Sequence, residues 1–174
     1  MESNSRTMFA IIAWTSFLTL VVVIAYGLVE SIRYYGTGLA VGQVLVDVYW
    51  PFTPYFAQPV TYFSVACVSL FYSGLRLWEV RISRWPGWLL SFLQMTGFVV
   101  AFSSAYEVLY NFMLWGATYS VAALTSDFPN PDALFSNYPA PWSFVFATRA
   151  FAALFVISGY SVYFLRRLSN SRLM

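Results

Sequence analysis

Four long apolar runs are the feature of this sequence that most constrains its fold. A helix needs about 20 apolar residues to cross the hydrocarbon core of a membrane, because that core is about 30 Å thick. Charged residues make up only 9% of the chain, against about 25% in an ordinary soluble domain. The sequence therefore predicts an all-α integral membrane protein, a four-helix transmembrane bundle that forms a single domain over residues 1–174. The predicted spans cover about residues 8–29, 55–75, 87–115 and 142–165.

The sequence does not determine one boundary in each of two predicted spans, the start of the second and the end of the third. Pro59 is an alternative first turn for the second span, because proline is favoured at the start of a helix. The third run stays apolar well past residue 115, and a helix from Trp88 to Leu124 would be about 54 Å long. We therefore expect this helix either to project beyond the membrane or to bend near Gly116. Because the extra segment is apolar, it should contact a protein partner or lie in the membrane interface.

The predicted loops differ in character. The loop around Arg81 is short, which favours the second and third spans as antiparallel neighbours. The external loop at about residues 30–54 contains an apolar stretch, 39–50, that is too short to span, so it should lie in the interface or pack on the end of the bundle. The other external loop, at about residues 116–141, is rich in proline and should be solvated. Asp127 and Asp132 within it could hold a hard cation, although a plain solvated loop explains them as well.

Arginine placement predicts the orientation of the chain. One side of the predicted bundle has seven arginines and two glutamates, a net charge of +5, and the other has Arg33 and four acidic residues, a net charge of −3. Arginines in short loops are retained on the cytoplasmic side. We therefore expect a multi-pass protein of the plasma (cytoplasmic) membrane with both termini in the cytoplasm. The arginines of the positive side are Arg6, Arg76, Arg81, Arg84, Arg166, Arg167 and Arg172.

Glu107 and Arg149 are the ionisable residues inside the predicted spans. Such residues are costly in a membrane and are candidate functional sites by default. Counted from the span ends, their depths differ by roughly 8 Å, a gap that the arginine side chain can bridge. The sequence predicts an intramembrane ion pair between them. This pair could lock the helix register, form part of a proton or ion pathway, or contact a ligand headgroup.

A seam of small and polar residues follows the third span. Its members recur at spacings of three and four, so they share one face of a helix. Small and polar side chains let membrane helices approach closely and hydrogen-bond, so this face should look into the bundle. It serves either as ordinary helix packing or as a polar pocket bordered by Glu107. The seam consists of Gln94, Gly97, Ala101, Ser104, Val108, Asn111, Trp115 and Thr118.

The chain contains no histidine and one cysteine. These counts predict no catalytic residues, no metal site and no covalent or His-ligated cofactor. The net charge of +2 gives no basic surface for nucleic acid. Aromatic residues make up 21% of the chain, and most tryptophans fall near span ends, where they anchor helices in the interface. The aromatic residues also leave open a bound lipid or quinone.

Three function classes follow from these observations. The leading hypothesis is a non-catalytic accessory subunit of a larger multi-subunit membrane complex, for example a respiratory or other energy-converting one, with other integral membrane subunits and membrane lipids as partners. The second is a small homo-oligomeric channel or transporter with a polar pathway ending at Glu107. The third is a lipid- or quinone-binding membrane protein or enzyme. In such an enzyme Glu107 would act as acid or base, and this class ranks last because the chain has no histidine, no lysine and no clear nucleophile.

Overall fold

The structure, a computed structural model, describes residues 3–36, 38–47, 58–125 and 143–171. It is all-α in these residues, and four of its helices are long and apolar enough to cross a membrane, which confirms that part of the prediction. Helix α3 begins at Pro59, the alternative start that the sequence offered. The elements are α1 (Ser3–Tyr35), α2 (Val41–Asp47), α3 (Pro59–Leu77), α4 (Glu79–Ile82), α5 (Gly87–Thr125) and α7 (Phe144–Asn170).

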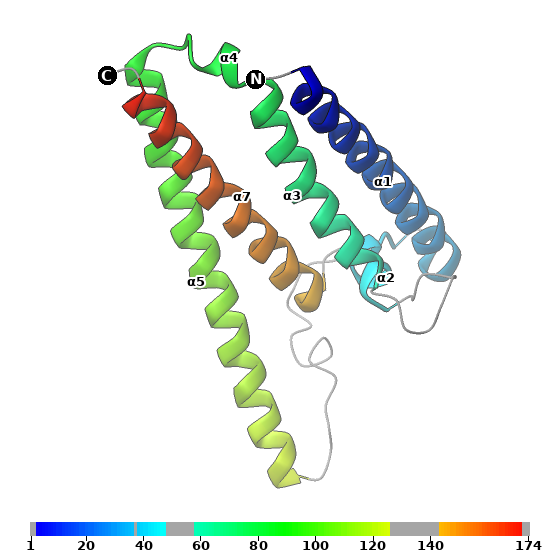
Figure 1. The fold of residues 1–174 in the computed structure, drawn as a ribbon. Coiled ribbons are helices and arrows are strands. Elements are labelled where there is room, and N and C mark those ends of the chain that lie inside the picture. The colour runs from blue at the N-terminus through cyan, green and yellow to red at the C-terminus, as the bar shows by residue number, and fades with distance from the viewer. Residues whose placement is uncertain (1–2, 37, 48–57, 126–142, 172–174) are drawn as a thin grey trace.

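The four long helices form an open row in the order α1, α3, α7, α5 (Figure 1). Extensive packing joins α1 to α3, α3 to α7 and α7 to α5, whereas α1 and α5, at the two ends of the row, make at most marginal contact. The second and third spans are therefore not neighbours, contrary to the expectation from their short loop, because α7 lies between them. The short connection between α3 and α5 crosses the end of α7, because Ile82 of α4 is buried there against Phe164, Leu165 and Leu168.

At the opposite end of the row, α2 packs on the long helices. Leu45 and Val46 of α2 are buried in one cluster with Val23 of α1, Val60 of α3 and Phe146 of α7. The described part of the apolar stretch between the first two long helices, α2, therefore packs on the bundle, one of the two outcomes that its sequence predicted.

A turn directs the chain from α1 into α2. Gly36 has a positive φ of 59°, a conformation that glycine adopts without steric cost. After this turn, the backbone N–H of Ala40 donates a 2.7 Å hydrogen bond to the Oγ of Ser31, which is fully buried. This bond ties the start of α2 to the last turns of α1.

Helix α5 is much longer than the membrane requires. Its 39 residues correspond to about 58 Å. It continues without a break through Gly116, so neither the predicted bend there nor a loop beginning at residue 116 is present. A glycine costs a helix only about 1 kcal/mol relative to alanine, which is not enough to end one. The helix passes the start of α7, where Trp115 stacks on Phe144 with ring centroids 6.4 Å apart, and ends beyond it (Figure 1).

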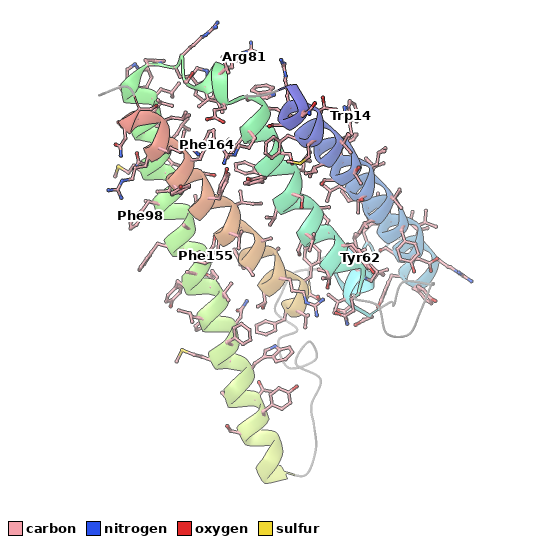
Figure 2. All side chains as sticks on the ribbon, in the orientation of Figure 1. Trp14, Tyr62, Arg81, Phe98, Phe155 and Phe164 are labelled. Atoms are coloured by element: carbon pink, nitrogen blue, oxygen red, sulfur yellow. The ribbon has the colours of Figure 1, made fainter. Side chains whose placement is uncertain are left out.

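Both ends of the chain lie at the same end of the row, together with α4 (Figure 1). Arg81 lies at this end (Figure 2), and Arg166 and Arg167 are in the last turns of α7. The arginine-rich segments thus gather at one end of the row, as they must if they share one side of a membrane. Arg172, Asp127 and Asp132 lie outside the described residues.

Candidate functional site

The polar seam of α5 lies against α7, and the two helices pack closely at Gly97. A Cβ atom at Gly97 would lie 3.1 Å from the Cγ2 of Val162, so the glycine lets the two backbones approach. Further along α5, Ser104 is buried, while Gln94 is partly buried one turn before Gly97. From Gln94 to Ser104 the seam is therefore occupied by helix packing.

Asn111 makes the polar contact between the two helices. Its Nδ2 donates a 2.8 Å hydrogen bond to the Oγ1 of Thr148 on α7, and that hydroxyl donates in turn to the carbonyl oxygen of Phe144 at 2.9 Å. Asn111 is only 1% exposed, and its Oδ1 has no hydrogen-bond partner within the described residues. A buried acceptor left unpaired is costly, so this oxygen marks an unfilled position.

Arg149 directs its side chain toward α3. Its Nη1 donates to the Oγ1 of Thr61 at 3.3 Å. Within the described residues the salt bridges are Glu30–Arg33 and Arg76–Glu79, each between residues three apart, and the predicted Glu107–Arg149 pair is not among them.

The depths of Glu107 and Arg149 can nevertheless be compared. Arg149 follows Thr148, the partner of Asn111, and Glu107 lies one helical turn, about 6 Å, from Asn111. Both ionisable residues thus lie on the same side of the Asn111–Thr148 contact, toward the arginine-rich end, and their depths differ by about 4.5 Å along the helix axes.

A pocket of about 210 Å³ opens beside Arg149, between α5 and α7. It combines a cation, the amide of Asn111, a hydroxyl and aromatic rings. Sequence reasoning singled out Arg149 and Asn111 but missed Thr148 and Thr61, for which the available signal was a threonine within an apolar run. The pocket is lined by Asn111, Phe112, Trp115, Val145, Thr148 and Arg149.

A second groove, of about 310 Å³, lies between α1 and α3, and Thr61, the hydrogen-bond partner of Arg149, lines it. Several of its side chains carry hydroxyls, but at least Thr19 uses its hydroxyl locally, donating to the carbonyl oxygen of Thr15 at 2.9 Å. Its lining residues are Thr15, Ser16, Thr19, Thr61, Tyr62, Val65, Ala66 and Ser69.

No group of three or more His, Cys, Asp or Glu side chains that could hold a metal ion occurs within residues 3–36, 38–47, 58–125 and 143–171. Cys67 is a free, partly buried thiol. Around Arg149 the available chemistry is hydrogen bonding and positive charge, which suits binding of a polar or anionic group.

No protein family, curated protein or solved structure matches this chain.

Proposed function

We propose that this chain is a non-catalytic subunit of a larger membrane complex, such as a respiratory or other energy-converting complex. In this proposal it lies in the plasma (cytoplasmic) membrane with both termini and α4 in the cytoplasm, because the arginines near that end of the row follow the positive-inside rule. Its role is to bind and stabilise other integral membrane subunits. The surface of α5 that faces away from α7 is the binding face.

The composition of this α5 face carries the proposal. Its large exposed side chains are aromatic or methionine except for Val99 and Leu109. Aromatic residues and methionine are enriched in protein interfaces, and methionine adapts its shape to a partner surface. Figure 2 shows Phe98 projecting away from α7. The large exposed side chains of α5 are Trp88, Phe92, Met95, Phe98, Val99, Phe102, Tyr106, Leu109, Tyr110, Phe112, Met113 and Tyr119, of which Phe112 also lines the pocket against α7.

Helix α1, at the other end of the row, provides an internal comparison. Its exposed aromatic and methionine side chains, Met8, Trp14, Phe17, Tyr34 and Tyr35, lie toward its two ends, whereas from Leu18 to Ile32 its large exposed side chains are all aliphatic. An aliphatic surface is well solvated by lipid tails, which are as apolar as leucine. Two outer helices of one chain thus differ in the chemistry of their outward faces, and α5 has the one suited to a protein partner.

The length of α5 and the open row add support. Residues 116–125 continue past the start of α7, and Tyr119 within them is exposed. In each candidate span, at most 17% of the most apolar window is buried within the chain itself. A row of helices with two uncovered faces has ample surface for neighbouring subunits.

Site-specific photo-crosslinking in native membranes tests this proposal. A photoreactive residue at Phe102 or Met113, which are 71% and 74% exposed, should form a discrete adduct with another integral membrane protein. The matched controls are Leu18 and Val22 on the exposed face of α1, which should form lipid adducts. Adducts at the α5 positions with lipid alone, or with a second copy of this chain alone, would contradict the proposal.

The two alternative functions have less support. A channel along the α5 seam needs a continuous polar path, whereas the seam packs closely on α7 at Gly97 and Asn111. Full ion or proton flux in liposomes after Glu107→Gln would exclude that path. An enzyme acting on a lipid or quinone needs a reactive group beside the substrate, and the pocket residues offer binding groups instead.

A further inference from the structure

We infer that the pocket beside Arg149 binds the headgroup of an anionic, hydroxyl-bearing membrane lipid, of the glycerol phosphate type. The phosphate accepts hydrogen bonds from the guanidinium of Arg149, and a glycerol hydroxyl donates to the Oδ1 of Asn111. This inference does not depend on the proposed role as a subunit.

The charge of Arg149 is the first reason. Arg149 lies six residues past Ser143, the N-cap of α7, and therefore about 9 Å into the membrane-spanning helix. A guanidinium has five N–H donors, and the hydrogen bond it forms with the described residues is the 3.3 Å bond to Thr61. A cation at this depth is stabilised by an anion, and a planar guanidinium pairs well with the oxygens of a phosphate.

The Oδ1 of Asn111 narrows the chemistry of the ligand. Asn111 is buried and lines the same pocket, and this oxygen lacks a donor within the described residues. A carboxylate side chain from a protein partner would satisfy Arg149 but offers no donor to Asn111. A glycerol phosphate headgroup offers the anion and the hydroxyl on neighbouring atoms, so it satisfies both residues at once.

The size and surroundings of the pocket fit a headgroup whose chains stay in the bilayer. A volume of about 210 Å³ is small for a whole lipid but sufficient for a polar head. The remaining walls include Phe112, Trp115 and Val145. Phe112, which lines the pocket, is also exposed, so the pocket opens to the outside of the row and acyl chains can extend from it.

The fluorescence of Trp115 allows a direct test with the full chain in lipid nanodiscs. Phosphatidylglycerol brominated near the carboxyl end of its acyl chains is titrated into phosphatidylcholine discs, and the contribution of Trp115 is the difference between wild type and Trp115→Phe. We expect brominated phosphatidylglycerol to quench the Trp115 fluorescence saturably. Half-maximal quenching should need a mole fraction at least tenfold lower than with brominated phosphatidylcholine. Equal quenching by the two lipids would overturn the inference, and this comparison needs no change at Arg149.

Variants then test whether Arg149 and Asn111 cause the lipid preference. Arg149→Gln should reduce the preference for phosphatidylglycerol over phosphatidylcholine at least tenfold. In Asn111→Leu, phosphatidylglycerol should be preferred no more than phosphatidic acid, which lacks the glycerol headgroup. The matched control is Arg33→Gln, an arginine that is exposed and lies near the same end of the row. Retention of the full preference in Arg149→Gln would overturn the inference. Stabilisation by soluble glycerol 3-phosphate without any lipid-specific quenching would overturn the assignment to a lipid.

Discussion

Asn111 on α5 and Thr148 on α7 face each other across the most extensive helix contact of the molecule and form a 2.8 Å side-chain hydrogen bond. This bond fixes the register of the two helices. It also places Arg149 at the pocket between them, because Arg149 is the next residue after Thr148. The packing of α5 on α7 and the position of the candidate site therefore share one determinant.

A double-mutant cycle on this pair measures its contribution. Asn111→Leu and Thr148→Val each remove one partner while keeping a side chain of similar size. Hydrogen bonds between membrane helices contribute about 0.6 kcal/mol on average and up to about 1.7 kcal/mol, so we expect a coupling free energy in that range. Reversible unfolding in mixed detergent micelles supplies the free energies of unfolding. Strict additivity of the two substitutions would show that the bond does not stabilise the pair.

Two glycines of α5 make a matched test of the close contact with α7. At Gly97 a new Cβ would lie 3.1 Å from Val162 and must displace it, whereas nothing lies within 4 Å of a Cβ at Gly116. Gly116→Ala should stabilise the protein by up to about 1 kcal/mol through helix propensity. Gly97→Leu should destabilise it by about 1–3 kcal/mol, because the inserted side chain overpacks the contact. Thermal unfolding in detergent compares them, and equal stability of the two variants would refute the close approach at Gly97.

The sequence predicted the elements of this fold better than their arrangement. Run length located the long helices, Pro59 located the start of α3, and the apolar stretch containing Leu45 indicated a packed α2. The order of the helices in the row depends on the burial of Ile82 against the end of α7, a long-range contact that no local pattern encodes.

The same limit applies to the candidate site. Residue counting put Glu107 about 8 Å nearer than Arg149 to the end of the bundle away from the arginine-rich loops, whereas in the structure Glu107 lies slightly closer to the arginine-rich end. It also did not give the direction of the Arg149 side chain, which depends on the position of Thr61 on another helix. The continuity of α5 through Gly116 was open for a different reason, since glycine is compatible with both a helix and a break.

The packing of α2 on α1 can be tested at Gly27. A Cβ there would lie 3.0 Å from the Leu45 and Val41 side chains, so Gly27→Leu should displace α2. In a Cys67→Ser background, Val44→Cys reports this movement, because Val44 is buried in α2. We expect this cysteine to be alkylated slowly while residue 27 is glycine. In the Gly27→Leu variant its alkylation should be at least tenfold faster. An unchanged rate would mean that α2 does not depend on this contact.

The orientation in the membrane is testable with single cysteines in the same Cys67→Ser background. Tyr34, near the end of α1, and Val80, in α4, are both exposed and lie at opposite ends of the row. A membrane-impermeant maleimide added to intact cells should label Tyr34→Cys, and it should label Val80→Cys only after lysis, because the arginine-rich end is retained inside. The reverse labelling pattern would invert the proposed topology.

The mass of the native particle tests the central claim most directly. Extracted from its own membrane in mild detergent, the chain should elute with other integral membrane proteins at a fixed stoichiometry. Paired substitution of Phe102 and Met113 by alanine should reduce this association at least tenfold, while alanine at Leu18 and Val22, which are exposed on α1, should leave it intact. Recovery of the unaltered chain alone, as a monomer or a homo-oligomer, would contradict its role as a subunit of a larger assembly.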